Sequence, residues 1–275
     1  MIYITYEDLC RDIRENLTKI PRDACGVVGV PRSGMLPATI IAEYLNVPMF
    51  DLHSLVEIGH GGRPLRRTAG NKLLVVDDTC FHGNSLTAIK RTLREHGYDG
   101  FDFEFLVVYL EGPCDRDKPD LWLRDIRDEA KGGPFGWAIY EWNLFAHGRL
   151  TDRTLFDLDG VICVEPPDER NVEAYEAYIK NPTPLHIPTG KANICTYRLE
   201  KYADATIDSL EKMGVDYVTV TMASDRSVPA WRLKADMYAK GEWLLFVESS
   251  DCQARKIHEE TGKPVICVET NKLYC

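Results

Sequence analysis

Two pairs of acidic residues stand directly after short apolar runs that have the character of buried strands. In LLVVDDTCFHGNSL, residues 73–86, Asp77 and Asp78 follow the apolar run and precede a turn of small residues. In LFDLDGVIC, residues 155–163, Asp157 and Asp159 flank a leucine. Ligands of parallel sheets bind beyond the carboxyl ends of the strands, so both pairs are candidate site residues.

The segment that follows Asp77 and Asp78 predicts a phosphate site. A Gly-containing loop at a helix N-terminus offers convergent backbone N–H groups and the positive end of the helix dipole, which suits a phosphate. Ser85 can add a hydroxyl donor, and the two acids would accept hydrogen bonds from sugar hydroxyls. The expected phosphate-binding residues of this loop are Thr79, Cys80, His82, Gly83, Asn84 and Ser85.

Asp157 and Asp159 predict phosphoryl chemistry instead. Alternation along an extended strand places both carboxylates on one side, and Gly160 allows a sharp turn beside them. One carboxylate can attack phosphorus while the other protonates the leaving oxygen. Because a phosphate ester is itself an anion, a cation is needed beside these carboxylates, and Mg²⁺ is implied.

Strands that alternate with helices surround both pairs. In the first half we expect strands over residues 24–30, 72–78 and 103–111 and helices over 5–17, 35–46 and 85–97. In the second half we expect strands over 192–197, 216–222, 243–249 and 263–269, with helices over 199–214, 232–241 and 251–262. Short apolar strands separated by helices indicate parallel sheets covered on both faces.

A Gly- and aromatic-rich segment, residues 131–150, interrupts this pattern. A chain of 275 residues also exceeds the usual size of one domain. We therefore predict an α/β fold of two tandem doubly wound domains, each with a mainly parallel sheet, over residues 1–148 and 149–275.

Composition excludes several classes of partner. The net charge of −10 argues against a general affinity for nucleic-acid backbones or anionic membranes. The nine cysteines contain no CxxC pair, which argues against a zinc site and favours reduced thiols. No apolar run approaches the roughly 20 residues that span a bilayer. We expect a cytoplasmic protein, with a homodimer as one possible assembly.

The first constellation resembles the signature with which type I phosphoribosyltransferases bind 5-phosphoribosyl 1-pyrophosphate (PRPP). The family pattern is DDxxxTGxT; here Gly83 matches and Ser85 takes the last hydroxyl place, whereas His82 stands where the family has threonine. The resemblance implies that Asp77 and Asp78 hold ribose hydroxyls while the loop holds the 5-phosphate.

Two upstream segments extend this resemblance. GVVGVPRSGMLPATIIAEYLNVP, residues 26–48, is similar to the family's pyrophosphate loop, and Arg32, Ser33 and Gly34 carry the match. SLVEIGHGGRPLRR, residues 54–67, stands where the family has a mobile lid. The lid resemblance implies that guanidinium groups close on pyrophosphate oxygens. The candidates are Arg63, Arg66 and Arg67.

The second constellation resembles the haloacid dehalogenase superfamily of phosphatases, whose first motif is DxD. The resemblance implies Asp157 as nucleophile, Asp159 as general acid, Thr196 as the hydroxyl that binds the phosphoryl group, and Lys234 as the cation that neutralises developing charge, with Lys240 as the alternative cation. It also implies a Mg²⁺ site made by Asp157, Asp159 and Glu248, which Asp251 could join. Residues 168–181 stand where the superfamily inserts a cap, here a small one.

Together the resemblances imply a bifunctional enzyme of nucleotide metabolism. One domain would transfer a phosphoribosyl group between PRPP and a nucleobase-like acceptor, or catalyse the reverse reaction. The other would hydrolyse a phosphomonoester with Mg²⁺ through an aspartyl-phosphate. Two alternatives stand beside this interpretation: a sensor that binds PRPP or a nucleotide without transferase turnover, and a phosphatase whose first domain only recruits substrate. The sequence does not identify the base.

Overall fold

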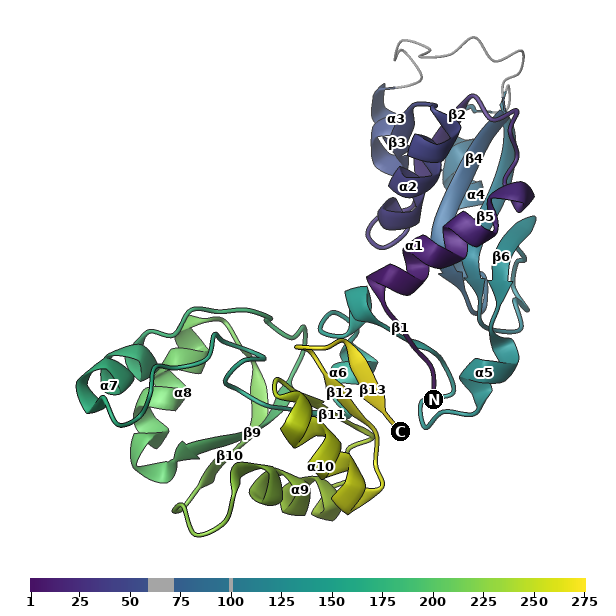
Figure 1. Ribbon diagram of the computed structural model, residues 1–275. Coiled ribbons are helices and arrows are strands. Elements are labelled where there is room, and N and C mark those ends of the chain that lie inside the picture. Colours follow the sequence, from purple (N-terminus) through teal and green to yellow (C-terminus); the bar gives the residue numbers. More distant parts are fainter. Residues whose placement is uncertain (59–71, 99–100) are drawn as a thin grey trace. The chain divides into compact units, whose positions relative to one another are not determined.

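The computed structural model in Figure 1 describes residues 1–58, 72–98 and 101–275. The chain divides into two compact units, Met1–Tyr140 and Glu141–Cys275. Both units are built on sheets in which nearly all neighbouring strands run parallel. The expected α/β class with parallel sheets is therefore confirmed.

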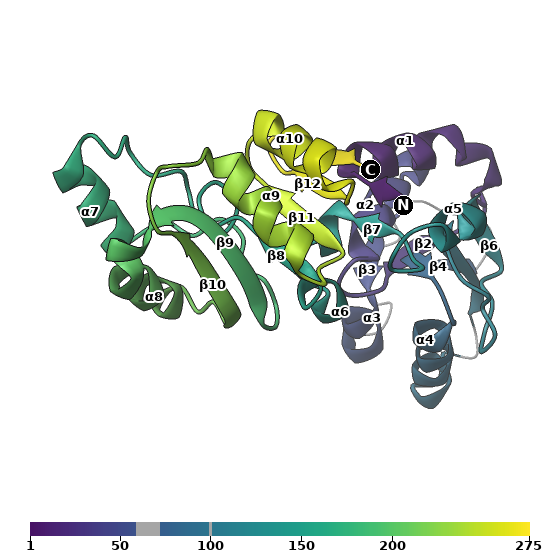
Figure 2. The ribbon, with the colours of Figure 1, turned by 90° about the horizontal axis from the view of Figure 1, so that it is seen from below.

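The first unit contains a five-stranded sheet of order β3-β2-β4-β5-β6, in which every neighbouring pair is parallel. Its strands are β2 (Gly26–Gly29), β3 (Met49–Asp51), β4 (Lys72–Cys80), β5 (Asp102–Leu110) and β6 (Leu121–Asp125). The helices of this unit are α1 (Tyr6–Glu15), α2 (Met35–Leu45), α3 (Leu52–Ile58), α4 (Asn84–Glu95) and α5 (Arg127–Lys131). Figure 2 shows α1 and α4 on opposite sides of this sheet.

Helix α4 packs on the sheet through one apolar stripe. Leu86, Ile89 and Leu93 recur at helical spacing, and all three are buried. They join one core cluster with Leu73 and Val75, which alternate along β4 and so share a face of the sheet. The same spacing that predicted helix and strand therefore fixes how α4 lies on β4, and with it the place where the loop between them opens.

The strand order of the first sheet reverses between β2 and β4, the two neighbouring strands that precede α2 and α4. A crevice forms at such a switch point, because the connections leave in opposite directions there. The loop after β2 carries Arg32, and the loop after β4 carries Gly83. The two segments predicted to bind phosphate groups are therefore neighbours at one sheet edge.

A separate two-stranded parallel sheet pairs β1 (Tyr3–Ile4) with β7 (Ile139–Tyr140). No pattern in the sequence predicts this pairing. It joins the beginning of the first unit to its end. Short 3-10 turns occupy Leu17–Lys19, Glu141–Asn143 and Glu200–Tyr202.

The second unit contains a six-stranded sheet of order β10-β9-β8-β11-β12-β13, in which only the β12–β13 pair is antiparallel. Its strands are β8 (Thr154–Phe156), β9 (Ala192–Leu199), β10 (Tyr217–Ala223), β11 (Leu245–Glu248), β12 (Val265–Cys267) and β13 (Lys272–Tyr274). Its helices are α6 (Gly148–Thr151), α7 (Val172–Lys180), α8 (Ala203–Lys212), α9 (Ala230–Lys240) and α10 (Asp251–Thr261). The strand order reverses between β8 and β11, so this unit also has a switch point.

Within the described parts of the chain, no helix combines the length and the apolar character that crossing a membrane requires.

Candidate functional site

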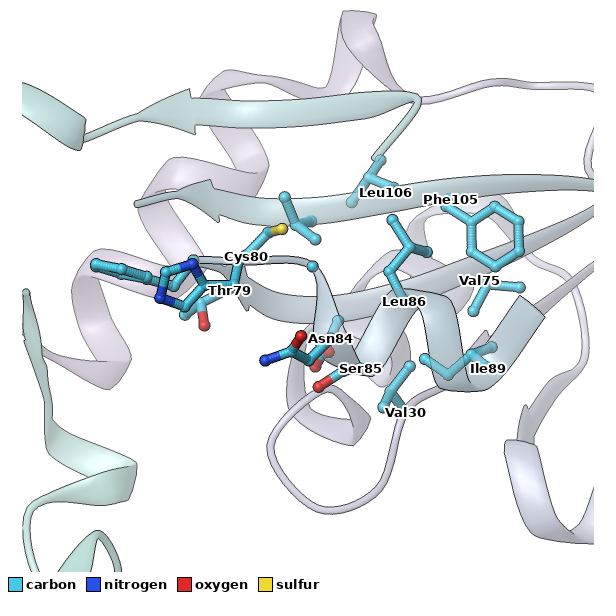
Figure 3. A pocket seen from close by; sticks show the side chains of 15 residues that line it. Val30, Val75, Thr79, Cys80, Asn84, Ser85, Leu86, Ile89, Phe105 and Leu106 are labelled. Atoms are coloured by element: carbon cyan, nitrogen blue, oxygen red, sulfur yellow. The ribbon is translucent and has the colours of Figure 1, made fainter. Parts of the chain in front are cut away.

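A cavity of about 230 Å³ opens in the first unit where β4 ends and α4 begins. Figure 3 shows the lining side chains, with Thr79 and Cys80 from the end of β4 and Asn84 and Ser85 from the start of α4. Its deeper wall is apolar and includes Val75, Ile89 and Phe105. Seven of the predicted PRPP-binding residues line it together: Asp77, Thr79, Cys80, His82, Gly83, Asn84 and Ser85.

Gly83 fixes the shape of the loop between β4 and α4. Its φ of +83° lies in the left-handed region, and a Cβ atom at this position would lie 1.9 Å from the carbonyl oxygen of Asp117. No other residue fits there without moving the backbone. The Gly83 carbonyl accepts a hydrogen bond from the Thr87 amide at 3.0 Å, which starts α4. The first-turn N–H groups of the helix are thereby held at the mouth of the cavity.

The loop before α2 packs against the end of β4 through Gly34. This glycine is buried, and a Cβ on it would lie 2.8 Å from the Asp77 Oδ1 atom. Arg32 is exposed and donates to the Ser33 hydroxyl at 3.4 Å. Gly34 therefore lies directly beside Asp77, with no room for a side chain between them. The candidate lid residues Arg63, Arg66 and Arg67 lie outside the described residues.

Asp77 and Asp78 place two carboxyl groups side by side near the end of β4. Burial raises the pKa of Asp77 well above its usual range, and the neighbouring Asp78 raises it further. Asp77 accepts a hydrogen bond from the Asp78 amide at 2.9 Å, and Asp78 accepts one from the Thr79 amide at 3.0 Å. A ligand that brings hydroxyl donors or a cation would stabilise both ionised carboxylates.

In the second unit, all four residues predicted to be catalytic line one cavity of about 230 Å³. Asp157 and Asp159 follow β8, Thr196 lies in β9, and Lys234 lies in α9. The segment between β8 and β9 adds Glu165, Pro166, Pro167, Glu169 and Tyr175 to the wall. This cavity therefore lies beside the carboxyl ends of β8 and β9.

Lys234 joins two carboxylates inside this cavity wall. Its Nζ atom lies 2.8 Å from Asp157 Oδ2 and 2.7 Å from Glu248 Oε2, and all three side chains are buried. Burial alone would lower the pKa of Lys234, but the two carboxylates hold it above its usual value. Burial and Glu248 raise the pKa of Asp157. Lys240, the alternative cation, is exposed at the end of α9.

Asp159 is held by Arg198, a residue that the sequence analysis did not single out. The Arg198 Nε atom lies 3.0 Å from Asp159 Oδ2, and its Nη2 atom lies 2.5 Å from Oδ1. The Arg198 side chain is only 1% exposed. Thr196 and Arg198 are two residues apart in β9 and share a face, so this spacing could have identified Arg198. The Thr196 hydroxyl oxygen accepts a hydrogen bond from the Arg198 amide at 3.2 Å.

The three predicted magnesium ligands of this unit do not fit a Mg²⁺ ion as they lie. Asp157 and Glu248 share the ammonium group of Lys234, and Asp159 is paired with Arg198. Among the residues that the structure describes, no group of three or more His, Cys, Asp or Glu side chains is placed to hold a metal. Asp251 faces Thr270 and Tyr274 instead, as the acceptor of their hydroxyl hydrogen bonds at 3.0 and 2.5 Å.

The first unit has relatives of known family. Residues 2–141, about half of the chain, match the family described as the phosphoribosyl transferase domain. The chain belongs to this family.

A xanthine-guanine phosphoribosyltransferase of Chromohalobacter salexigens is 27% identical over 148 residues, which cover 51% of this chain and 83% of that protein. A xanthine-guanine phosphoribosyltransferase of Idiomarina loihiensis is 23% identical over 156 residues, covering 53% and 88%. A solved structure of Helicobacter pylori xanthine-guanine-hypoxanthine phosphoribosyltransferase matches with 18% identity and a TM-score of 0.38, over 52% of this chain and 92% of that one.

His82 marks a departure inside the phosphoribosyl transferase loop. Its Nδ1 atom lies 2.7 Å from Asp115 Oδ1, and both side chains are about half exposed. Asp115 lies beyond the end of β5, outside the segment that carried the family resemblance in the β4 loop. The His82 imidazole ring therefore contacts a second loop of this domain, the loop that follows β5.

Glu111 is a buried acid of the phosphoribosyl transferase domain that the sequence analysis missed. It directly follows β5, the neighbour of β4, and is 6% exposed. Its carboxylate accepts hydrogen bonds from the Ala138 amide at 2.5 Å and the Tyr140 hydroxyl at 3.1 Å. Burial raises the pKa of Glu111 to about 7, with a contribution from Asp78. An acid directly after an apolar run was the signal that could have found it.

The pKa of Glu111 predicts a pH-dependent stability. Because the folded-state pKa of about 7 exceeds the usual 4.5, folding favours the protonated acid, and this stabilisation is lost as pH rises from about 4.5 through 7. Glu111→Gln cannot titrate. Between pH 5 and 8 we expect wild type to lose about 2 kcal/mol of unfolding free energy relative to Glu111→Gln, measured by urea denaturation. An equal difference at both pH values would contradict the assignment.

Proposed function

We propose that the first unit transfers a phosphoribosyl group between PRPP and a purine-like base. The observation that carries this proposal is that Asp77 and the loop around Gly83 line one and the same cavity, at the switch point of the first sheet. Membership of the phosphoribosyl transferase family supports the reaction class, and the xanthine-guanine relatives support a purine-like acceptor.

In this proposal each segment binds one part of PRPP. Asp77 and Asp78 accept hydrogen bonds from the ribose hydroxyls, the loop from Thr79 to Ser85 holds the 5-phosphate, and the loop from Arg32 to Gly34 faces the pyrophosphate. A base nitrogen forms a bond to ribose C1 and gives up its proton to solvent, while the C1–O bond to pyrophosphate breaks and pyrophosphate leaves with the electron pair. Mg²⁺ is the proposed cofactor, because it binds through one or two carboxylates together with substrate phosphates, and the Asp77–Asp78 pair suits it.

We propose further that the second unit hydrolyses the phosphate ester of a nucleotide. Asp157 attacks phosphorus, the bond to the ester oxygen breaks, and water then releases phosphate from the aspartyl-phosphate. The contact between Lys234 and Asp157 supports this role, because the ammonium group can neutralise charge that develops there. Asp159 is the proposed proton donor to the leaving oxygen. Donation requires that the Asp159 carboxyl group first takes up a proton from solvent and that its contacts with Arg198 open.

The proposed order of reactions is transfer followed by hydrolysis, since a transferase product carries the 5′-phosphate that the second unit would remove. We propose the predicted division between the two functional domains, between residues 148 and 149; it lies within α6, beyond the end of the first compact unit at Tyr140. The contact between His82 and Asp115 favours the second candidate, a domain that binds PRPP or a nucleotide without turnover. The position that the pattern DDxxxTGxT fills with a threonine hydroxyl here carries an imidazole that contacts Asp115. A recruiting first domain in front of a working phosphatase is a third candidate.

Mass spectrometry of products from PRPP, Mg²⁺ and a pool of free nucleobases tests the transfer. Wild type should form a base-dependent nucleotide or nucleoside. Gly83→Ala should lower product formation about 100-fold or more, because its Cβ would overlap the Asp117 carbonyl and displace the loop. Gly97→Ala is the matched control, since Gly97 has a similar φ of +75° but nothing within 4 Å of its Cβ position.

Equal activity of Gly83→Ala and Gly97→Ala would contradict the role of the loop. Absence of any base-dependent product from wild type, together with measurable binding of PRPP, would reject transfer to those bases in favour of the sensor.

A further inference from the structure

Arg198 occupies an unusual position for a guanidinium group. It extends from β9 into the wall of the second cavity, its side chain is 1% exposed, and two of its nitrogens contact Asp159. The remaining nitrogen, Nη1, is buried and has no hydrogen-bond partner among the described residues. An unsatisfied buried donor costs free energy. Arg198 is therefore held mainly by the pair with Asp159, with a further contact from Nη2 to the Cys163 Sγ atom at 3.5 Å.

Each of the three carboxylates that a divalent cation would need is already matched with a protein cation. Lys234 forms ion pairs with Asp157 and Glu248, and Arg198 forms one with Asp159. The two cations differ in the number of carboxylates that each neutralises. Lys234 lies between two carboxylates, whereas Arg198 neutralises one carboxylate that is itself 16% exposed toward the cavity. Asp159 is thus the acid that an incoming cation could reach, and Arg198 is the group with which it would compete.

We propose that Arg198 is a positioning residue that acts as an internal counter-ion for Asp159 and keeps a divalent cation from binding there. In the arrangement described here, Arg198 takes the place of a divalent cation beside Asp159. Removing its charge frees both oxygens of Asp159 and removes the repulsion of a fixed positive charge, so a divalent cation binds more tightly. The proposal takes Asp157, Asp159 and Glu248 as the ligand set that the sequence predicts, and it does not depend on the proposed hydrolysis.

The test measures metal binding rather than turnover, so its failure is distinguishable from failure of the hydrolase proposal. Mn²⁺ is the probe, and the free ion is counted by electron paramagnetic resonance during titration of the full-length protein without substrate. Arg198→Met should lower the dissociation constant for Mn²⁺ by about tenfold or more relative to wild type. Arg226→Met is the matched control, because Arg226 lines the same cavity but pairs with Glu169. We expect it to change the constant by less than about threefold.

Asp159 supplies the decisive comparison. The double variant Arg198→Met/Asp159→Asn should lose the gain, which would show that the additional metal is bound at Asp159 rather than elsewhere in the chain. If Arg198→Met does not fold, Asp159→Asn alone decides: its amide oxygen can still accept from Arg198, and it should leave wild-type Mn²⁺ affinity within about twofold if Arg198 already occupies the carboxylate. Equal affinity of wild type and Arg198→Met, or a tenfold loss in Asp159→Asn alone, would overturn the proposal.

Discussion

Asp157→Asn is expected to reduce phosphate release from a 5′-nucleotide by about 10³-fold or more, because an amide cannot attack phosphorus to form the acyl phosphate. The substitution keeps an oxygen that can accept the hydrogen bond now donated to Asp157 by the Leu158 amide at 2.9 Å. The first unit is unchanged, so transfer should continue. Mass spectrometry should then find a nucleotide where wild type gives a nucleoside.

Asp251→Asn is the matched control for this experiment. Asp251 also follows a strand of the second sheet, but its carboxylate accepts from Thr270 and Tyr274 and does not line the cavity. Phosphate release should persist in Asp251→Asn. Release by Asp157→Asn at the wild-type rate would remove Asp157 as nucleophile and leave the second unit without the proposed hydrolysis.

Lys234→Met is expected to lower the unfolding free energy of the second unit by about 3–5 kcal/mol at pH 8. Wild type holds Asp157 and Glu248 around one ammonium group, all three buried. The variant leaves two buried carboxylates without their cation, and removal of one partner costs more than the pair itself contributes. Native-state hydrogen exchange of residues 154–158 and 245–248 measures this free energy for the second unit alone.

The deficit of Lys234→Met should shrink as pH falls. Loss of the cation raises the folded-state pKa of Asp157, which burial and Glu248 already hold high, so the folded variant binds protons that the unfolded chain does not. The destabilisation is then largest above this pKa and is lost as pH falls through it. Lys240→Met, at the exposed end of the same helix, should change stability by less than about 0.5 kcal/mol. Similar losses in the two variants would show that the Lys234 ion pairs contribute little.

The elements that carry the predicted sites could be derived from the sequence because their patterns are local. Val75 and its apolar neighbours mark β4 without reference to any other segment. Thr5 caps α1 through a capping box with Asp8, which is a relation between residues three apart. The same local patterns identify the site residues. Asp77 and Asp157 each stand at the end of an apolar run, and Lys234 lies one turn inside a helix.

The partners of these groups could not be derived, because they come from distant segments. Glu111 depends on the Ala138 amide and the Tyr140 hydroxyl, which β7 brings near only after it pairs with β1. Each of these two strands has two residues, too few to show any periodicity. The sequence contains many Lys and Arg residues that could pair with Asp159. Only packing of β9 beside β8 selects Arg198, and this selection turns an expected metal ligand into half of an ion pair.

The parallel pairing of β1 and β7 has a mechanical consequence. Tension that enters the first unit at Tyr3 and leaves it at Tyr140 pulls the two strands along their length in opposite directions, because they run parallel in register. The hydrogen bonds between them, such as that from the Ile139 amide to the Ile2 carbonyl at 3.0 Å, then carry the load together rather than one after another. With two residue pairs in register, this short strand pair bears the applied force before the five-stranded sheet does.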